Sequence, residues 1–434
     1  MRFYDRKSEL DVLRRTAELS RTQSQFTVIM GRRRIGKTTL MLKAFEDTRS
    51  VYLFISRKSE GVLCADLQNA VRGSGIDIPG RLETFGDLLK ALMIHSAVEP
   101  ITVMIDEFQN LSYVNPSIYG DIQEVWDLMK DRARINLVVS GSVHSMMVRI
   151  FEDSKEPLFQ RCTRKLEVGP FRTEVLKQIL SDHNPGYGKR DLLALYMLTG
   201  GVPQYVEVLM DSGAVDREAI ICTALSPGSV FLREGDDLMT AEFGKDNKVY
   251  LSILQLIASG IGSRARIEDV LKISAGEYLR RLDEEYGFVT RDLPMVTGDH
   301  RLGRWRLTDM YLSFYFRYVQ PNQSFVEAGR TDLLERTVGA DIESYEGHVL
   351  ERYLTQRIRE EWEYTAVGGY WNRKGDVEID IVVMDDIARS VRMIEVKRNP
   401  DKLDMGDLRR KAETLEPLLR SYRVELAGMS MDDM

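Results

Sequence analysis

The segment from Gly31 to Thr38 has the sequence GRRRIGKT, which fits the pattern G-x-x-x-x-G-K-[ST]. It follows the apolar run QFTVIM (Gln25–Met30) and precedes the helical pattern TTLMLKAFE. The glycines of such a loop allow successive backbone N–H groups to point inward around phosphate oxygens, and the N-terminus of the following helix adds positive potential. The segment therefore requires a strand–loop–helix unit near the start of the chain, and it predicts a phosphate-binding loop.

Three further short apolar runs follow, at 50–55, 101–106 and 135–140, separated from one another by helical patterns. Strands that are apolar along their whole length are buried on both faces, as in a parallel sheet covered by helices. The carboxyl ends of such strands meet at one edge of the sheet, where ligands bind. Residues 1–169 are therefore predicted to form an α/β domain with a parallel sheet.

The residues at the ends of these runs are suited to nucleotide hydrolysis. Lys37 would reach the β- and γ-phosphates, and the Thr38 hydroxyl would ligate Mg²⁺. Asp106 can hold Mg²⁺ through water, and Glu107 follows in position to polarise the attacking water. ATP and Mg²⁺ are thus the expected ligands. The residues expected to bind the nucleotide are Gly31, Arg32, Arg33, Arg34, Ile35, Gly36, Lys37, Thr38, Thr39 and Ser140.

Two details of this site have alternative interpretations. Ser140 and Ser142 end the fourth apolar run; either would contact the γ-phosphate or the attacking water, or would simply cap a turn. The three consecutive arginines, Arg32 to Arg34, would touch phosphate or DNA, or would form a solvated loop face.

Length and composition limit the class of protein. A chain of 434 residues is expected to form about three domains. With 60 Lys and Arg against 67 Asp and Glu, the net charge is −7, so any nucleic-acid contact must use a local basic patch. The three scattered cysteines argue against a disulfide framework or a zinc cluster. No apolar run approaches the ~20 residues that span a bilayer, and the charged N-terminus lacks a signal peptide, so we expect a cytoplasmic protein without membrane contact.

Beyond residue 169 the patterns change. From Pro170 to Phe243 they are helical, interrupted by GGVP (Gly200–Pro203), which indicates a small helical lid. Three helical patterns and two strand-like pieces, FVTRDLP and RWRLTD, then follow in the order of a winged helix-turn-helix. A further helix, the strand-like runs DVEIDIVVM and SVRMIEVK, and a closing helix complete the chain. The expected domains are 1–169, 170–244, 245–330 and 331–434.

The predicted winged helix has two open interpretations. Its hairpin carries Arg291, Arg301, Arg304 and Arg306, and a basic wing can lie along a phosphate backbone while the third helix enters the major groove. That third helix, EYLRRLDEEYG, contains acidic residues as well as arginines. The phosphates of DNA would repel these acidic residues. DNA binding and an intramolecular or protein-contact role therefore both remain open.

The C-terminal strands carry residues suited to phosphodiester chemistry. Asp380 ends the run DVEID, while Glu395 and Lys397 point to one face of the next strand. Asp380 and Glu395 would share a Mg²⁺ while Lys397 positions water, with Glu346 on the preceding helix as the additional carboxylate. Against this, residues 331–434 contain 16 Lys and Arg and 23 Asp and Glu, which would repel DNA. The alternative is a nuclease-like fold whose acidic residues serve protein contacts.

Motifs in order along the chain resemble those of archaeal-type P-loop ATPases of the AAA+/STAND branch: FYDRKSEL, GRRRIGKTTL, IDEFQNL, VVSGS and GGVP. The resemblance implies that FYDRKSEL lies near the adenine and that GGVP packs near the nucleotide. It also implies that Arg161 senses the γ-phosphate in cis or in trans; the alternative is an ordinary surface or helix-capping arginine. The order helical Glu, ID, then ExK resembles the PD-(D/E)XK restriction-endonuclease-like fold. The implied fold is a P-loop NTPase sheet with a helical lid, a winged helix-turn-helix and a C-terminal α/β endonuclease-like domain.

Two functions fit these patterns. The first is an ATP-hydrolysing enzyme that couples nucleotide state to DNA binding and to Mg²⁺-dependent nucleic-acid cleavage. The second is a STAND-like nucleotide switch whose inactive nuclease-like domain recruits a protein. The partners expected are ATP or ADP, DNA through the winged helix and C-terminal domain, and further copies of the chain in a homo-oligomer. The candidate catalytic residues are Lys37, Glu107, Arg161, Glu395 and Lys397, and the candidate metal ligands are Thr38, Asp106, Glu346, Asp380 and Glu395.

Overall fold

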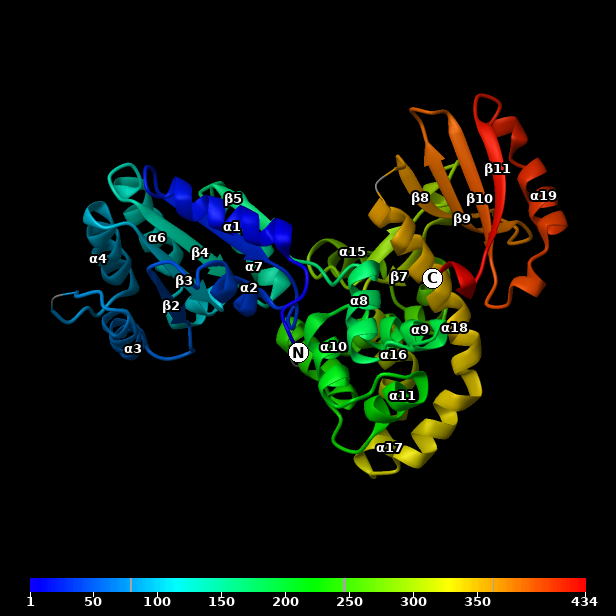
Figure 1. The fold of residues 1–434 in the computed structure, drawn as a ribbon, viewed down its shortest axis with the longest axis horizontal. Helices are drawn as coiled ribbons and strands as arrows, with labels where there is room; N and C mark the ends of the chain where they lie inside the picture. Colours follow the sequence, from blue (N-terminus) through cyan, green and yellow to red (C-terminus); the bar gives the residue numbers. More distant parts are fainter. Residues whose placement is uncertain (79, 245–246, 362) are drawn as a thin grey trace. The chain divides into compact units, whose positions relative to one another are not determined.

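The computed structural model describes residues 1–78, 80–244, 247–361 and 363–434 (Figure 1). By its internal contacts the chain divides into two compact units. Asp5–Gly169 form one unit, and Met1–Tyr4 together with Pro170–Met434 form the other. The border at 169/170 coincides with the first boundary expected from the sequence. The three later domains expected from the sequence all lie in the second unit, and their division stays a prediction.

The first unit is built on a five-stranded parallel sheet with the order β2-β3-β4-β1-β5. Every residue of β1, β3 and β4 is buried, as expected for strands covered by helices on both faces. The four predicted strands are confirmed, except that the second ends one residue earlier. The fifth was missed because its sequence, RKLE, is charged and mostly exposed, as is common at a sheet edge. The strands are β1 (Gln25–Met30), β2 (Ser50–Phe54), β3 (Ile101–Asp106), β4 (Ile135–Ser140) and β5 (Arg164–Glu167).

Helices follow most strands of this unit and cover the sheet. The first helix packs on the second and on β1, and the fourth packs on the sixth and on β4. The fourth begins at a side-chain cap, because Oγ1 of Thr84 accepts a hydrogen bond from the backbone N–H of Asp87. The helices are α1 (Lys7–Leu19), α2 (Lys37–Ala44), α3 (Glu60–Gly73), α4 (Phe85–Val98), α5 (Leu111–Val114), α6 (Ile118–Met129) and α7 (His144–Glu152).

The second unit begins with the expected helical region (green in Figure 1). Gly200 ends one helix in a left-handed conformation, and Pro203 begins the next at a position where its missing N–H is harmless. Gly201 also has a positive φ of 80°, and a Cβ there would lie 2.5 Å from the carbonyl oxygen of Phe171, so GGVP is a tight helix-to-helix turn. The helices are α8 (Thr173–His183), α9 (Lys189–Thr199), α10 (Pro203–Asp211), α11 (Arg217–Leu225) and α12 (Glu234–Phe243).

The next segment contains three helices followed by a two-stranded antiparallel hairpin. These are the elements expected for a winged helix, although the assignment to that fold stays a prediction. The aromatic run from Tyr311 to Val319 is almost wholly buried, so it packs the interior rather than offering exposed rings. The elements are α13 (Lys248–Ala258), α14 (Arg264–Leu271), α15 (Gly276–Glu284), β6 (Val289–Asp292), β7 (Arg304–Leu307), α16 (Met310–Phe314), a π-helical turn (Tyr315–Val319) and α17 (Gln323–Glu327).

The C-terminal part starts with the 31-residue helix α18 (Thr331–Glu361) and continues into a four-stranded sheet with the order β11-β10-β9-β8 (orange to red in Figure 1). The two central strands and the closing helix match the predicted ones. The two edge strands were not predicted. β8 contains two adjacent glycines, and β11 is exposed at its first two residues and half-buried at the rest, so neither has the pattern of a buried strand. The elements are β8 (Ala366–Trp371), β9 (Glu378–Asp385), β10 (Ser390–Val396), α19 (Met405–Glu413) and β11 (Arg423–Met429).

Within the residues that the structure describes, every helix is too short or too polar to cross a membrane.

Candidate functional site

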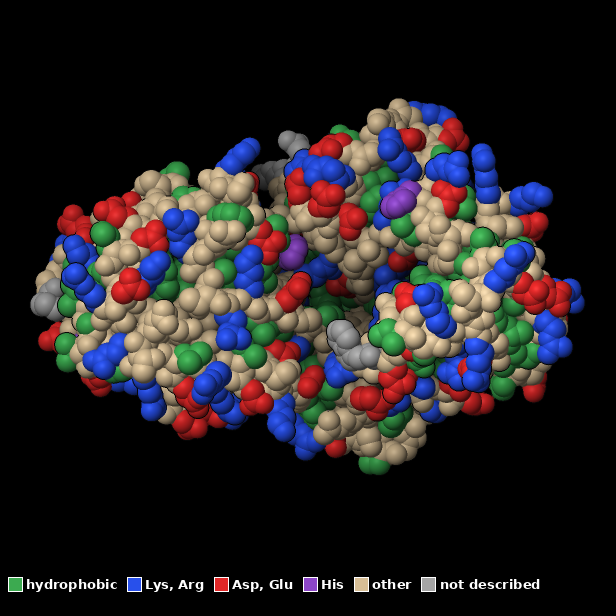
Figure 2. Space-filling model, turned by 90° about the horizontal axis from the view of Figure 1, so that it is seen from above, with side chains coloured by type: hydrophobic (Ala, Val, Ile, Leu, Met, Phe, Trp, Pro, Cys, Tyr) green, Lys and Arg blue, Asp and Glu red, His purple; other side chains and the backbone are tan. Residues whose placement is uncertain are grey.

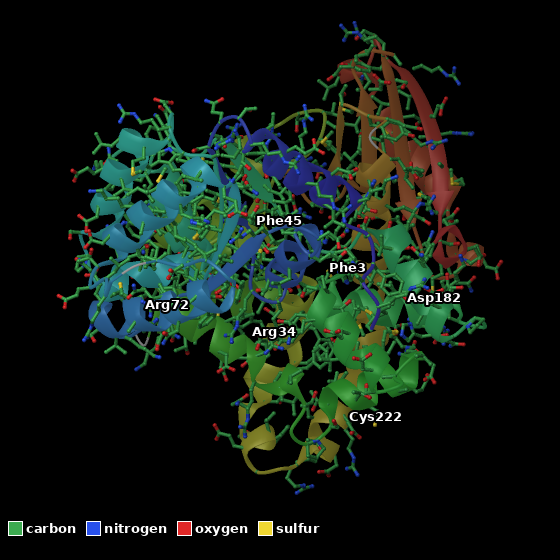
Figure 3. The ribbon with its side chains drawn as sticks, turned by 60° about the vertical axis from the view of Figure 1, so that its left-hand side comes forward. Phe3, Arg34, Phe45, Arg72, Asp182 and Cys222 are labelled. Atoms are coloured by element: carbon green, nitrogen blue, oxygen red, sulfur yellow. The ribbon has the colours of Figure 1, made fainter. Side chains whose placement is uncertain are left out.

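The loop between β1 and α2 adopts a conformation that requires glycine at two positions. Gly31 has a φ of 151°, and a Cβ there would lie 2.5 Å from the carbonyl oxygen of Val168. Gly36 has a φ of 86° and caps α2. Arg34, labelled in Figure 3, is also left-handed, with a φ of 69°. These positive φ values turn the loop back on itself directly before a helix N-terminus, the geometry that binds phosphate.

Lys37 lies inside this loop. Its side chain is buried, and Nζ donates hydrogen bonds to the carbonyl oxygens of Gly31 (2.7 Å) and Arg32 (2.8 Å). A buried ammonium is stable only when it is paired. Phosphate oxygens would offer it stronger, charged acceptors at the same loop.

Asp106 connects three elements at the carboxyl edge of the sheet. Its Oδ2 accepts hydrogen bonds from Oγ1 of Thr38 (2.6 Å) and from the hydroxyl of Tyr52 (3.0 Å), and its Oδ1 accepts one from Oγ of Ser140 (2.5 Å). Burial and the adjacent Asp106 carboxylate raise the pKa of Tyr52, which keeps its hydroxyl a donor. The structure thus brings Thr38, Asp106 and Ser140 together.

Glu107 follows with a φ of 56°, and its backbone N–H donates to Oδ1 of Asp106 (2.9 Å). Its carboxylate accepts hydrogen bonds from Nε2 of Gln109 (2.5 Å) and Oγ of Ser142 (2.8 Å). Each of the two serines at the end of β4 is therefore paired with one of the two acidic residues at the end of β3. Ser140 binds Asp106 and Ser142 binds Glu107. Contact of either serine with phosphate stays a prediction.

Sequence reasoning missed three residues at this site: Tyr52, Gln109 and His144. Tyr52 is a strand residue and Gln109 lies in a short helical turn, so neither fits a phosphate-binding motif. His144 begins α7, and its pKa is lowered by burial and by the positive charges of Arg32 and Lys37. One available signal was the short sequence distance of Gln109 from Glu107 and of His144 from Ser142.

The donor set around Asp106 fits Mg²⁺. The Thr38 hydroxyl and the Asp106 carboxylate are both oxygen donors, which this hard cation prefers, and they lie within hydrogen-bond distance of each other. Within the described ranges, His, Cys, Asp and Glu side chains form no group of three or more that could hold a metal ion.

Arg161 lies away from the phosphate-binding loop. Its guanidinium donates to the carbonyl oxygen of Phe159 (3.0 Å) and to Asp127 (3.2 Å), beside Gln23 and Ser24. These residues lie at the amino end of β1, whereas the phosphate-binding loop follows its carboxyl end. A six-residue strand separates the two by about 20 Å. This position does not favour sensing of the γ-phosphate by Arg161 in cis, and a role in cis or in trans stays a prediction.

Arg6, from the segment FYDRKSEL, lies beside the phosphate-binding loop. It is buried, and its guanidinium donates to the carbonyl oxygens of Gly169 (2.5 Å) and Ile35 (3.5 Å) and to Glu9 (3.0 Å). The preceding Tyr4 belongs to the other unit, where its hydroxyl donates to Asp182 (2.9 Å), labelled in Figure 3. Proximity of the segment to adenine stays a prediction.

The C-terminal site differs from the expected one at its helical residue. Glu346 accepts hydrogen bonds from Arg217 (2.6 Å) and Arg398 (2.7 Å), and only 4% of its side chain is exposed. A carboxylate between two guanidinium groups is already neutralised, which does not favour Glu346 as a ligand shared with Asp380 and Glu395, and that ligation stays a prediction. Glu351, five residues later, is the helical carboxylate close to both. Burial and the charges of Asp380 and Glu378 raise its pKa to about 8.

Asp380, Glu395 and Lys397 do come together. Ile394 pairs with Ile381 across the antiparallel ladder, which makes Asp380 and Glu395 neighbours at the next position. Nζ of Lys397 lies 2.6 Å from Glu395 and 3.9 Å from Asp380. A second ammonium, from Lys411, lies 3.4 Å from Glu395. As arranged, these lysines neutralise the two carboxylates, and metal ligation by Asp380 and Glu395 stays a prediction.

The arginines expected to contact DNA are engaged within the protein. In the hairpin, Arg306 pairs with Asp292, Arg301 with Asp299, and Arg304 with Glu378 (2.6 Å). The remaining one, Arg291, donates to a backbone carbonyl. On α15, Arg280 pairs with three glutamates, which raises its pKa, and Arg281 pairs with one of them. Positive and negative side chains are also interspersed over the face seen in Figure 2.

The hairpin also packs on the C-terminal sheet. The backbone N–H of Met295 donates to the carbonyl oxygen of Gly369 (2.9 Å), and the indole of Trp371 donates to that of Leu302 (2.8 Å). The guanidinium of Arg304 lies 4.5 Å from the centre of the Trp371 ring. These contacts support the intramolecular interpretation of the hairpin.

Comparison with known proteins identifies the type of fold. Residues 3–209 match the family model of an ATPase domain predominantly from Archaea, and residues 315–407 match a family of archaeal and bacterial proteins of unknown function. An uncharacterised protein of Methanocaldococcus jannaschii is 29% identical over 91% of this chain and 87% of its own length. A Walker-type ATPase of Pyrococcus abyssi is similar in structure, with a TM-score of 0.55 and 17% identity over 73% of this chain and 96% of its own. The parallel sheet is thus similar in fold to that of a P-loop ATPase.

Proposed function

We propose that this protein binds and hydrolyses ATP at the loop between β1 and α2. The observation that carries the proposal is the hydrogen bond from Thr38 to Asp106, 2.6 Å long. It joins the end of the phosphate-binding loop to the acidic residue of a neighbouring strand. The match of residues 3–209 to an ATPase-domain family supports the same function.

The chain's own groups account for each part of the reaction. Backbone N–H groups of the loop and the ammonium of Lys37 hold the phosphates, and Glu107 accepts a proton from the attacking water. Thr38 and Asp106 would hold Mg²⁺, which neutralises phosphate charge when bound. Ser140 and Tyr52 keep Asp106 oriented through their hydrogen bonds.

Two substitutions separate binding from hydrolysis. Lys37→Ala should abolish both, because the loop loses its buried positive charge. Glu107→Gln should retain nucleotide and lose hydrolysis roughly 10²- to 10⁴-fold, the usual contribution of a general base. Lys43→Ala is the matched control, since Lys43 lies on the same helix and pairs at the surface with Glu46. Phosphate release and binding of a fluorescent ATP analogue measure the two properties. Wild-type protein with neither property would refute the proposal.

A second candidate function is nucleic-acid cleavage by the C-terminal part. The supporting observation is the juxtaposition of Lys397 with Glu395 and Asp380, next to the half-buried Glu351. Lys397 could stabilise a phosphate that gains negative charge during cleavage. Because the lysines neutralise the carboxylates as they stand, we derive no metal-dependent step at this cluster.

Cleavage is tested with single-stranded DNA, duplex DNA and RNA, each with Mg²⁺, Mn²⁺ or chelator. Lys397→Ala should abolish cleavage and leave ATP hydrolysis intact, whereas Lys402→Ala, an exposed neighbour, should affect neither. Absence of cleavage on all three substrates would eliminate this function. The alternative is then a STAND-like nucleotide switch, whose assembly state should differ between ATP and ADP in light scattering.

DNA binding through the hairpin has less physical support. The hairpin arginines Arg301, Arg304 and Arg306 are paired with carboxylates of this chain, and phosphate would have to displace those partners. A homo-oligomer would be required for any action of Arg161 in trans. Gel-shift titration at low salt and sedimentation at several protein concentrations test these two properties.

A further inference from the structure

The two hydrogen bonds to Glu107 fall on the same oxygen. Nε2 of Gln109 and Oγ of Ser142 both donate to Oε2, at 2.5 and 2.8 Å. The other oxygen, Oε1, receives neither of them. A carboxylate anchored through one oxygen by two donors has a fixed plane, so the direction of its second oxygen is fixed as well.

The backbone supports the same orientation. Glu107 adopts a left-handed conformation, with a φ of 56°, which is unfavourable for a residue with a side chain and persists where surrounding contacts impose it. Here its N–H is held by Oδ1 of Asp106 at 2.9 Å. Main chain and side chain of Glu107 are therefore fixed by separate hydrogen bonds.

Gln109 is itself held rigidly. It is fully buried, and its backbone carbonyl accepts hydrogen bonds from the hydroxyls of Ser112 (2.9 Å) and Tyr119 (3.3 Å). Its amide packs against Gly141 so closely that a Cβ on Gly141 would lie 2.3 Å from Oε1. Burial and this close contact restrict the movement of the Gln109 side chain.

The same amide has an unsatisfied acceptor. Oε1 of Gln109 is buried without a hydrogen-bond partner among the residues that the structure describes. Such an atom destabilises the fold, and an apolar side chain of equal size would avoid that cost. The benefit of glutamine at this position therefore lies in what Nε2 does, which is to bind Glu107.

We propose that Gln109 is a positioning residue which, together with Ser142, fixes Oε2 of Glu107 so that Oε1 faces the attacking water. This inference rests on the proposed ATP hydrolysis. In that reaction water oxygen bonds to the γ-phosphorus, the bond to the bridging oxygen breaks, and ADP leaves with that electron pair. One proton of the water passes to Oε1 and then to solvent. Gln109 contributes no proton and touches no reacting atom.

The test compares Gln109→Met in the wild-type and Glu107→Gln backgrounds. Methionine keeps the volume and removes the donor. Hydrolysis should fall roughly 10- to 100-fold, as for a misplaced catalytic group, with KM for ATP changed less than twofold. In the Glu107→Gln background the same change should cause no further loss, because Gln109 acts through Glu107. Gln68→Met is the control: Gln68 is a buried glutamine of the same unit, bonded to Gly80 and Leu82, and its substitution should not lower hydrolysis.

Each outcome decides the inference. Unchanged kcat in Gln109→Met, or an equal loss in both backgrounds, would overturn it while leaving ATP hydrolysis established by the wild-type protein. Should Gln109→Met fail to fold by circular dichroism, Ser142→Ala provides the same comparison, with a loss expected only where Glu107 is present. A wild-type chain that hydrolyses no ATP would overturn the proposed function itself, and this inference with it.

Discussion

Oγ1 of Thr38 donates a 2.6 Å hydrogen bond to Oδ2 of Asp106, which lies 68 residues later in the sequence. The bond joins the start of α2 to the end of β3. This hydrogen bond brings the phosphate-binding loop and the acidic residues at the end of β3 together in one site.

Removing this hydroxyl should impair hydrolysis more than stability. Thr38→Ala deletes both the bond to Asp106 and a candidate Mg²⁺ ligand, so we expect at least a roughly 100-fold lower rate, similar to loss of one preorganised polar group. Thr38→Ser keeps the hydroxyl and should retain most activity. Phosphate release at saturating Mg²⁺ checks this, and equal rates in the two variants would contradict it.

Glu346 should be important for stability. Its buried carboxylate pairs with Arg217 and Arg398, and Glu346→Ala would leave both arginines without their shared partner. We expect the free energy of unfolding to fall by about 3 kcal/mol, the lower end for a broken buried pair, because both arginines keep some solvent contact. Glu343→Ala removes an exposed partner of Arg398 and should cost less than about 1 kcal/mol. Urea unfolding followed by circular dichroism compares them.

Glu351 should make stability depend on pH. Burial and neighbouring carboxylates raise its pKa from an ordinary value near 4.5 to about 8 in the folded chain. Between those values the folded state binds a proton that the unfolded state has lost, so this residue reduces stability as pH rises, by at most about 1.4 kcal/mol per pH unit. Glu351→Gln should therefore gain stability relative to wild type between pH 5 and 8.

The control for Glu351 is Glu335→Gln on the same helix, where the side chain is exposed. Its stability difference from wild type should not vary over that pH range. A constant difference for Glu351→Gln as well would contradict the assignment of Glu351 to the carboxylate cluster.

Two glycines of the first unit should respond in opposite ways to alanine. A Cβ on Gly141 would lie 2.3 Å from Gln109 Oε1 and from Met147 Sδ, so Gly141→Ala should cost about 1–3 kcal/mol through overpacking. Gly120 lies within α6 with no heavy atom within 4 Å of an added Cβ, so Gly120→Ala should stabilise by about 0.5–1 kcal/mol. Thermal unfolding measures both, and a stabilising Gly141→Ala would refute the packing argument.

Arg161 should have no effect on hydrolysis by a single chain. It lies at the amino end of β1 and pairs with Asp127, far from the phosphate-binding loop. Arg161→Ala should therefore keep the wild-type rate at protein concentrations where sedimentation shows a monomer. A loss that appears only with increasing concentration would indicate action in trans, and a loss in the monomer would contradict the position described.

Much of the first unit could be predicted because its signals are local. The bounds of β1, β3 and β4 agree with three apolar runs, since strands buried on both faces have no polar alternation to obscure them. The phosphate-binding loop is contiguous, so its residues could be named together. The edge strands β5, β8 and β11 gave no such signal. Edge strands are partly exposed to solvent, so their sequences need not form a continuous apolar run.

The choice between Glu346 and Glu351 shows where such reasoning ends. Five residues of α-helix correspond to a rotation of about 140° between side chains, so the two glutamates face different surroundings although both fit a helical carboxylate. Glu346 pairs with two arginines, whereas Glu351 lies near the carboxylates of β9 and β10. Sequence spacing places both on the helix and says nothing of what packs against each face.

The sequence by itself determined the buried strands β1, β3 and β4 and the phosphate-binding loop, and it predicted the roles of Lys37, Thr38, Asp106 and Glu107, because periodicity and a contiguous motif are local properties of a chain. Only the tertiary structure decided that Tyr52, Gln109 and Ser142 hold the two acidic residues, and that the hairpin arginines pair within the protein. Those contacts join side chains from separate elements, and their geometry depends on strand register and packing that no short segment encodes.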